Sequence, residues 1–360
     1  MSNRKVFVTR PVSPKIWRLA FYFIDILQSR NYTNDGKYLK RLESKLQVLW
    51  KVKHVVIMSN GTLPIICLLE SLGRGKRVLT TPFTFVATTN AIIASGNIPI
   101  FIDVNKDTLI PSTESIELEL NRGGIAAVLL TQVFGLIPDY KRLQEICKNH
   151  NVPLFFDSSH SFGVEVESGS AFGIGSATTA SFHATKIFST IEGGAVATND
   201  SNLYEFAKAW RNFGIVNGEI TGQGVNGKMH EFSAAFGLAV LPKMNSEILR
   251  RKILSAKLCK TVKSNKVRVI SSPNASYFPV IFQSESEMFT IKDELERVGI
   301  FPRRYFFPSL DEVALPLGVE NLYCPNSRSL ADTVLCLPMG PNVDSKVIQN
   351  IEKVFKRYET

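Results

Sequence analysis

The sequence predicts an α/β protein with a large domain built on a mainly parallel central sheet flanked by helices, followed by a smaller C-terminal α/β domain. Short runs rich in Val, Ile, Leu and Phe alternate with amphipathic stretches over residues 55–198, a pattern typical of parallel strands joined by helices. The chain has 360 residues, 44% of them apolar, which is more than one ordinary domain needs. A long helical stretch from Glu231 to about Lys260 leads into the second α/β pattern. We therefore expect domains at residues 1–245 and 246–360.

Two amphipathic helices are expected before the first strand. Apolar residues recur at helical spacing from Ile16 to Leu27, and again from Leu39 to Leu49. The segment SRNYTNDG between them is rich in turn-forming residues. This polar loop is therefore predicted to separate the two helices.

The first strand of the sheet is expected at Val55–Met58, followed by the turn Ser-Asn-Gly-Thr and a helix. Gly61 lets the backbone come close to a ligand, and Asn60 and Thr62 suit a helix N-cap. The free N–H groups of a helix N-terminus attract anions. The turn is therefore either a simple cap or an anion site.

The alternation then continues in a regular order. Further strands are expected at Arg77–Thr81, Ile98–Ile102, Ala126–Leu130, Pro153–Phe156 and Ala195–Thr198, and helices at Thr84–Ala94, Ser112–Leu120, Tyr140–His150 and Leu203–Phe213. Ligands of parallel α/β sheets bind at the carboxyl ends of the strands. Asn60, Asp157 and Lys186 each follow an apolar run, so we expect them at that edge.

The stretch SFHATKIFSTIEGG, from Ser181 to Gly194, places one lysine between an apolar run and a glycine turn. A lysine amine held away from water loses part of its preference for charge and becomes a nucleophile able to form a Schiff base with an aldehyde such as pyridoxal phosphate (PLP). Asp157, at the mouth of the strand PLFF, could pair with the protonated pyridine nitrogen of such a ring. Each residue alone is also compatible with a surface lysine or a turn aspartate. Together with the turn at Gly61, they favour a cofactor site.

Glycine and proline residues mark the boundaries between the predicted elements in the remainder of the chain. The glycine-rich segment 214–232 is predicted to be a loop that is either mobile or shaped by a substrate. Pro242 should kink or divide the following helix. The C-terminal unit is expected to contain strands at Val267–Ile270, Tyr277–Phe282 and Val334–Leu337, and helices at Glu287–Val298, Ser327–Ala331 and Asp344–Tyr358.

Composition excludes several classes of partner. The net charge is +10, but the basic residues are spread along the chain, so nucleic acid is not expected as a primary partner; a phosphate-bearing cofactor or substrate would also use this charge. We expect no signal peptide, no membrane span and no metal site, because no segment has the required apolar length or histidine spacing. The five cysteines are scattered, as in a cytoplasmic protein with reduced thiols.

Six segments, in order along nearly the whole chain, resemble one family. The segments NGT, TPFTFVATTNA, PIFIDVNKDTL, DSSHSFG, SFHATKIFSTIEGGA and NGKMHEFSAAFGL are similar to those of the nucleotide-sugar aminotransferases of the DegT/DnrJ/StrS family. These are PLP-dependent enzymes of fold type I. The segments VTRPVSP and NYTNDG, with the histidine of DSSH, look most like the branch that makes dTDP-4-amino-4,6-dideoxy-D-glucose (viosamine).

The resemblance implies a role for each matching residue. Lys186 would bond to PLP and act with Asp157 in catalysis, and Asp157 would bind the pyridine nitrogen. The remaining positions implied to bind the cofactor are Phe85 and His160 at the ring, Gly61, Thr62 and Ser181 at the phosphate, and Asn226 at the phosphate of the neighbouring subunit's cofactor. Arg304 and Tyr305 would touch substrate.

The same resemblance implies an activity and a partner. The enzyme would transfer an amino group from L-glutamate to a nucleotide-linked sugar, dTDP-4-keto-6-deoxy-D-glucose, for O-antigen synthesis, as a homodimer with its active site at the interface. Three alternatives stay open: a 3-keto sugar acceptor, a UDP- or GDP-linked 4-keto sugar, and a non-catalytic regulatory or binding protein of the same fold. A sister type that uses histidine in place of the lysine is disfavoured by Lys186.

Overall fold

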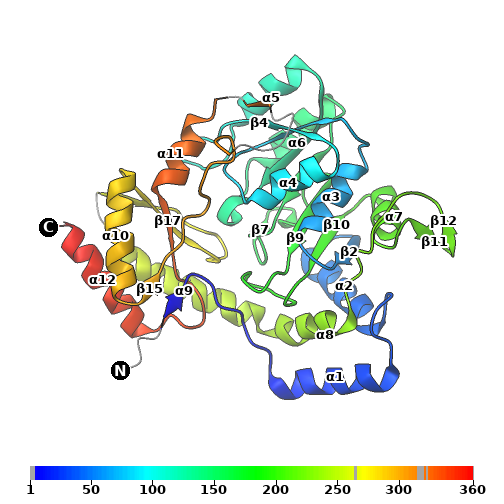
Figure 1. The fold of residues 1–360 in the computed structure, drawn as a ribbon, viewed down its shortest axis with the longest axis horizontal. Coiled ribbons are helices and arrows are strands. Elements are labelled where there is room, and N and C mark those ends of the chain that lie inside the picture. Colours follow the sequence, from blue (N-terminus) through cyan, green and yellow to red (C-terminus); the bar gives the residue numbers. More distant parts are fainter. Residues whose placement is uncertain (1–4, 263–265, 314–319, 322, 360) are drawn as a thin grey trace.

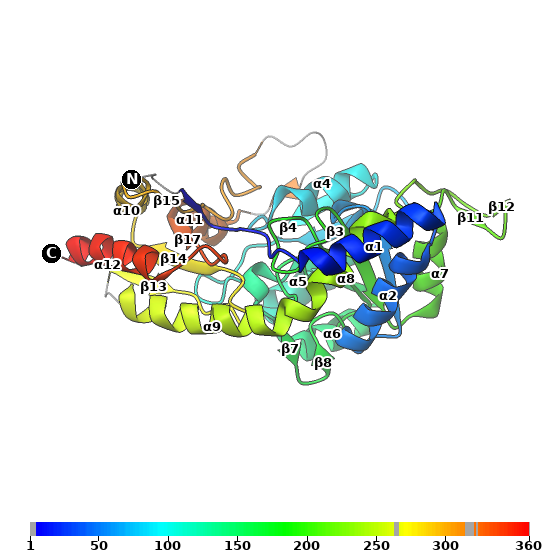
Figure 2. The ribbon, with the colours of Figure 1, turned by 90° about the horizontal axis from the view of Figure 1, so that it is seen from below.

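The protein has two lobes, which are described here from a computed structural model that covers residues 5–262, 266–313, 320–321 and 323–359 (Figure 1). The larger lobe contains the central sheet and the helices around it. The smaller lobe contains helices α10 (Glu285–Arg297) and α12 (Ser345–Glu359). Helix α9 (Met244–Thr261) runs from the larger lobe into the smaller one (Figure 2).

The central sheet has eight strands in the order β16-β4-β3-β5-β6-β9-β10-β2. Their bounds are β16 Glu320–Asn321, β4 Ile98–Phe101, β3 Arg77–Thr80, β5 Ile125–Thr131, β6 Leu154–Asp157, β9 Ala177–Ser181, β10 Gly194–Thr198 and β2 His54–Met58. Neighbours from β16 to β9 are parallel, and β10 is antiparallel to both β9 and β2. The predicted mainly parallel sheet is confirmed. The reversal at β10 means that the segment between Ser181 and Gly194 is a loop at the carboxyl end of β9.

Helices cover both faces of this sheet. In β5, Ala127 and Leu129 join the core under α3 (Thr62–Glu70), α4 (Val86–Ala94) and α7 (Ser201–Trp210). The alternate residues Val128 and Leu130 join the core under α5 (Thr113–Arg122) and α6 (Tyr140–Asn149). Because successive side chains of a strand face opposite sides, a strand buried on both sides is apolar throughout.

The two predicted N-terminal helices are confirmed as α1 (Ile16–Ser29) and α2 (Lys37–Trp50), which pack with α8 (Glu231–Val240). The carboxylate of the buried Glu231 accepts hydrogen bonds from the N–H groups of Tyr38, at 2.7 Å, and Leu39, at 2.9 Å, at the start of α2. As predicted, the long helical stretch divides at Pro242, where the turn η2 (Leu241–Lys243) separates α8 from α9. Proline has no N–H to continue the helix.

The smaller lobe is built on an antiparallel sheet of β13 (Val267–Val269), β14 (Phe278–Phe282) and β17 (Val334–Leu337). Helix α11 (Pro325–Thr333) precedes β17. Two segments cross the predicted division at residues 245 and 246. Strand β1 (Val6–Phe7) pairs with β15 (Ile300–Phe301) beside the smaller lobe, and β16 adds to the edge of the central sheet.

The glycine-rich segment forms a short hairpin of β11 (Ile215–Val216) and β12 (Glu219–Ile220), which projects from the larger lobe (Figure 2). A second small hairpin joins β7 (Glu165–Val166) to β8 (Gly169–Ser170), and a 3₁₀ turn, η1, lies at Val133–Gly135. Within the described ranges, none of the helices has the length and apolar character needed to cross a membrane.

Candidate active site

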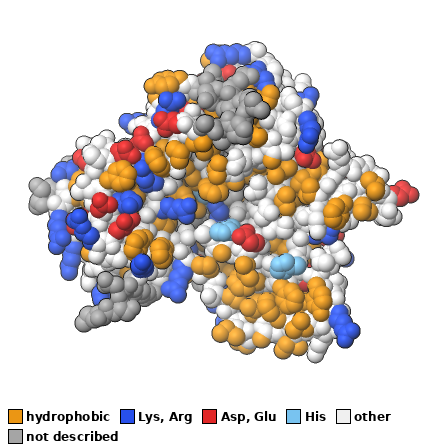
Figure 3. All heavy atoms as spheres, in the orientation of Figure 1, with side chains coloured by type: hydrophobic (Ala, Val, Ile, Leu, Met, Phe, Trp, Pro, Cys, Tyr) orange, Lys and Arg blue, Asp and Glu red, His pale blue; other side chains and the backbone are white. Residues whose placement is uncertain are grey.

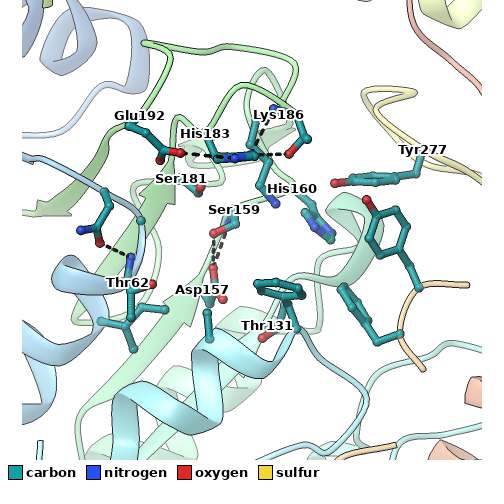
Figure 4. Close-up of a pocket in the computed structure, with 18 of the residues that line it drawn as sticks. Thr62, Thr131, Asp157, Ser159, His160, Ser181, His183, Lys186, Glu192 and Tyr277 are labelled. Carbon is teal, nitrogen blue, oxygen red and sulfur yellow. Dashed lines mark hydrogen bonds and ion pairs between the residues drawn. The ribbon is translucent and has the colours of Figure 1, made fainter. Parts of the chain in front are cut away.

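A cavity of about 280 Å³ lies where the parallel strands end, between the two lobes. The larger lobe contributes most of its wall, and Tyr277, Arg303, Tyr305 and Phe306 of the smaller lobe complete it. Figure 4 shows side chains from several strand ends and loops pointing into this space. The position agrees with the general rule for ligand sites in parallel α/β sheets.

Lys186 lies in this cavity on the loop between β9 and β10, where its N–H donates to the carbonyl oxygen of His183 at 2.9 Å. Burial lowers the pKa of its amine to about 8, against the opposing influence of the Asp157 carboxylate, and the positive charge of Arg303 adds to the lowering. A larger fraction of this amine is therefore neutral near pH 7 than for an ordinary lysine. A neutral amine is the nucleophilic form.

Asp157 is the last residue of β6 and is 5% exposed. Its carboxylate accepts three hydrogen bonds: from the Thr88 hydroxyl at 2.8 Å, and from the Ser159 hydroxyl and N–H at 2.5 and 3.1 Å. These bonds fix the position of the carboxylate in the cavity. The cavity therefore contains a carboxylate in a fixed position and orientation.

His160 is buried beside Asp157 and Lys186. Its Nδ1 accepts a hydrogen bond from the Phe134 N–H at 3.1 Å, which assigns the remaining proton to Nε2. Burial, and secondarily the charge of Lys186, holds the pKa of the imidazole well below its usual value. His160 is therefore a neutral ring with one N–H available to a ligand.

The turn before α3 has the features of an anion site. The Asn60 side-chain oxygen accepts from the N–H groups of Thr62 and Leu63, both at 3.0 Å, and orders the helix start. The Thr62 and Ser181 hydroxyls line the cavity, and neither makes a hydrogen bond to another described part of the chain. A Cβ on Gly61 would lie 2.7 Å from the Ser181 side chain, so only glycine permits this close approach. Two free hydroxyls at a helix N-terminus suit a phosphate group.

Aromatic side chains form the opposite part of the wall. Phe85, which is 50% exposed, precedes α4, and its ring lies 6.4 Å from that of Phe306. The Tyr277 ring lies 4.4 Å from His160, and Tyr305 packs against Tyr277. A flat ring bound between these groups would be held by aromatic contacts.

The structure brings together eight of the ten residues singled out from the sequence. Lining the cavity are Gly61, Thr62, Phe85, Asp157, His160, Ser181, Lys186 and Tyr305. Asn226 is exposed and does not line the cavity of its own chain; it pairs with Asn212 near the projecting hairpin.

Arg304 also lies outside the cavity. Its guanidinium bonds to Glu285 at 2.8 Å and to the Asp332 carbonyl at 3.2 Å, and it lies 3.4 Å from the centre of the Phe307 ring. The adjacent Arg303 lines the cavity instead.

The residues of the wall that the sequence did not reveal include four with polar side chains, His183, Glu192, Tyr277 and Arg303. His183 and Glu192 belong to the same stretch as Lys186, between β9 and β10. Their closeness to Lys186 in the sequence was the signal that could have identified them. Tyr277 and Arg303 come from the smaller lobe, and only the docking of the lobes brings them to the site. No local signal distinguishes such residues.

Comparison with known proteins gives a consistent result over nearly the whole chain. Residues 19–356 match the DegT/DnrJ/EryC1/StrS aminotransferase family. The chain is 33% identical to a dTDP-4-amino-4,6-dideoxy-D-glucose transaminase of Shigella dysenteriae, over 97% of this chain and 98% of that protein. It is 29% identical to an Escherichia coli protein of the same name, over 98% and 99%. The crystal structure of DesI in the presence of its TDP-sugar product superposes with a TM-score of 0.92 at 27% identity, covering 98% of this chain and 93% of that one.

Proposed function

The chain belongs to the DegT/DnrJ/EryC1/StrS aminotransferase family, and from this premise we propose that it transfers an amino group from L-glutamate to dTDP-4-keto-6-deoxy-D-glucose, giving dTDP-4-amino-4,6-dideoxy-D-glucose. The observation that carries the proposal is the Lys186 amine, with its lowered pKa, in the same cavity as an Asp157 carboxylate fixed by three hydrogen bonds. The choice of sugar is supported by the names of the two relatives described above. Use of the product in surface polysaccharide synthesis, within the cytoplasm, is part of the same proposal.

The cavity residues fit PLP, the cofactor of this family. The free hydroxyls of Thr62 and Ser181 would hold the phosphate beside the positive end of the α3 dipole, with Gly61 giving room for it. Asp157 would hold the pyridine nitrogen in its protonated form, and Phe85 would cover one face of the ring. The neutral His160 would donate its Nε2 proton to a ring oxygen.

The chemistry divides between cofactor and protein. PLP, when bound, supplies an aldehyde that accepts an amino group and an electron-poor ring that spreads negative charge from the carbon being deprotonated. The Lys186 amine takes the proton from the α-carbon of the amino donor and delivers a proton in the second half-reaction, as general base and then general acid. Its lowered pKa suits both tasks near neutral pH, because neither protonation state is rare. The Asp157 carboxylate acts throughout as a fixed negative charge.

Arg303 would bind the amino donor. Among the described residues that line the cavity, it is the one cationic side chain besides Lys186. A carboxylate is the natural partner of a guanidinium, and the donor carries one on the reacting carbon itself. In the nucleotide sugar, by contrast, the diphosphate is several bonds away from the keto carbon. We therefore assign the donor's carboxylate, rather than the diphosphate, to Arg303.

The active unit would be a homodimer. Five large apolar side chains form one exposed face of α1: Ile16, Trp17, Phe21, Ile24 and Leu27, between 54% and 84% exposed. Figure 3 shows hydrophobic side chains gathered in this region, on the face of the molecule toward which Figure 1 looks. A continuous apolar patch of this kind is typical of a protein interface. Asn226, exposed near the projecting hairpin, would then reach the cofactor phosphate of the partner.

The test is an assay with a panel of acceptors. The purified protein with PLP and L-glutamate is incubated with dTDP-, UDP- and GDP-linked keto sugars, and each product is identified by NMR. A 4-amino-4,6-dideoxyglucose linked to dTDP is the expected product. Conversion of a 3-keto, UDP- or GDP-linked sugar in its place would refute the acceptor proposed here. Lys186→Ala should abolish transfer while leaving the circular dichroism spectrum unchanged; retained transfer would refute the role of Lys186.

A further inference from the structure

A carboxylate and an imidazole, Glu192 and His183, form a pair at one side of the cavity (Figure 4). The His183 Nε2 lies 3.3 Å from Glu192 Oε1. The His183 Nδ1 accepts the Thr185 N–H at 3.2 Å and lies 2.7 Å from the Thr185 hydroxyl. Because Nδ1 is an acceptor, the ring proton of neutral His183 sits on Nε2 and points to Glu192. The imidazole therefore orients one carboxylate oxygen and leaves the other available.

The backbone that carries Glu192 is fixed in an unusual conformation. The preceding residue, Ile191, has φ of +74°, a region that β-branched residues avoid, and its side chain is 50% exposed. Two hydrogen bonds hold the turn: the Ser189 hydroxyl accepts the Ile191 N–H at 2.9 Å, and the Thr190 hydroxyl donates to the Glu192 carbonyl at 2.7 Å. Strain of this kind persists only where the surroundings determine it, and it is common at ligand sites.

The following residue closes the turn. A Cβ on Gly193 would lie 2.3 Å from the Thr190 hydroxyl oxygen and 2.4 Å from the Met229 methyl group, so a larger residue would displace these side chains. The chain is thus packed tightly on both sides of Glu192 while the Glu192 side chain itself remains 58% exposed at the cavity. The turn therefore directs the Glu192 carboxylate to the cavity and not into the protein core.

The chemical groups of the two substrates indicate which of them could bind the Glu192 carboxylate. The amino donor brings carboxylates and the nucleotide brings a diphosphate, and Glu192 repels both. The sugar ring is neutral and offers hydroxyl groups, which are good donors to a carboxylate. Asp157, the other acid of the wall, already accepts three hydrogen bonds.

We propose that Glu192, positioned by His183, accepts a hydrogen bond from a ring hydroxyl of the acceptor sugar and so determines which sugars the enzyme accepts. The inference rests on the proposed function. It assigns specificity to the β9–β10 loop and leaves the amino donor to another part of the cavity. His183 is a positioning residue, acting on the sugar through Glu192.

The experiment follows each half-reaction separately, by the absorbance change of the bound cofactor. The probes are L-glutamate, dTDP-4-amino-4,6-dideoxy-D-glucose, and the 2-deoxy and 3-deoxy analogues of that amino sugar. Glu192→Ala should slow the reaction with the parent amino sugar by about 10- to 100-fold, the usual range for a lost hydrogen bond to a charged group. Wild type should discriminate by a similar factor against one of the deoxy analogues, and Glu192→Ala should treat that analogue and the parent alike. The rate of the glutamate half-reaction should change by less than about 3-fold, because Glu192 makes no hydrogen bond to glutamate in this proposal.

Matched variants separate positioning from folding. Glu167→Ala removes an exposed surface carboxylate paired with Lys141 and should change neither half-reaction. His183→Ala should resemble Glu192→Ala, and His183→Gln should restore much of the rate, because the glutamine amide can donate from a position near that of Nε2.

Two results would overturn the inference. One is an equal loss with glutamate and with the amino sugar in Glu192→Ala. The other is unchanged discrimination between the parent and both deoxy analogues. Failure of wild type to react with any nucleotide amino sugar would instead overturn the proposed function, and this inference with it.

Discussion

Replacing Lys186 with methionine is expected to stabilise the cofactor-free protein at neutral pH. Burial lowers the pKa of the amine from 10.5 to about 8, a difference of 2.5. At about 1.36 kcal/mol for each unit, the folded state is destabilised by up to about 3 kcal/mol when the amine carries its proton. Methionine has a similar length and no charge. The pKa of about 8 already includes the favourable attraction of the Asp157 carboxylate, so about 3 kcal/mol is the net cost of the buried charge.

The pH dependence of this gain has a definite sign. Below pH 8 the amine is protonated in both folded and unfolded chains, and the full cost of burying its charge is present. Between pH 8 and 10.5 the unfolded chain holds a proton that the folded chain has lost, so the stability of wild type rises with pH. The advantage of Lys186→Met should therefore be largest below pH 8 and should shrink as the pH approaches 10.5.

Urea unfolding of the cofactor-free proteins measures this directly, at pH 7 and pH 9.5 and at one protein concentration. Lys45→Met, at an exposed position on α2, serves as control and should change stability by less than about 0.5 kcal/mol. The reasoning would be refuted if Lys186→Met were no more stable than wild type at pH 7. It would also be refuted if the gain were the same at both pH values.

Three other substitutions test separate parts of the site. Gly61→Ala should weaken PLP binding at least about 10-fold in an absorbance titration, because its methyl group would lie 2.7 Å from Ser181 and overpacking is costly; Gly222→Ala, which meets no atom, should not. Thr88→Val removes the 2.8 Å hydrogen bond to Asp157 and should lower kcat by about 10-fold or more with the fold intact, the usual effect of losing a bond to a charged group; an unchanged kcat would argue against a role for this carboxylate. The double variant Trp17→Glu, Phe21→Glu should sediment as a monomer with reduced activity, whereas Leu118→Glu, at an exposed position on α5, should behave as wild type.

Local sequence patterns predicted the helices and strands well, because the pattern of each element lies within its own segment of the chain. The alternation of apolar runs and amphipathic stretches gave every strand from β2 to β6, and Pro242 gave the division between α8 and α9. The antiparallel direction of β10 and the pairing of β1 with β15 depend on contacts between distant segments. No local propensity encodes such pairings.

Arg303 and Arg304 show that the sequence also does not determine which of two adjacent side chains enters the cavity. The sequence suggested Arg304, but the structure turns Arg304 toward Glu285 and Asp332 and gives the cavity Arg303. The backbone of Arg303 forms an isolated antiparallel bridge with Cys336, and in extended backbone consecutive side chains face opposite sides. A shift of one residue therefore exchanges the two roles, and the sequence RRY alone does not fix that register.

A ping-pong reaction uses one cavity for two substrates in turn, and this cavity has two walls of different charge. Glu192 and His183 belong to the larger lobe, while Arg303 belongs to the smaller one. If the walls serve different substrates, Arg303→Gln should slow the glutamate half-reaction by about 10- to 100-fold and leave the amino-sugar half-reaction nearly unchanged, the reverse of Glu192→Ala. Arg304→Gln is the matched control: it should reduce stability, through loss of its bonds to Glu285 and Asp332, without separating the two half-reactions. Equal losses in both half-reactions for Arg303→Gln would mean that the two substrates share one charged contact, and the division of labour between the lobes would be wrong.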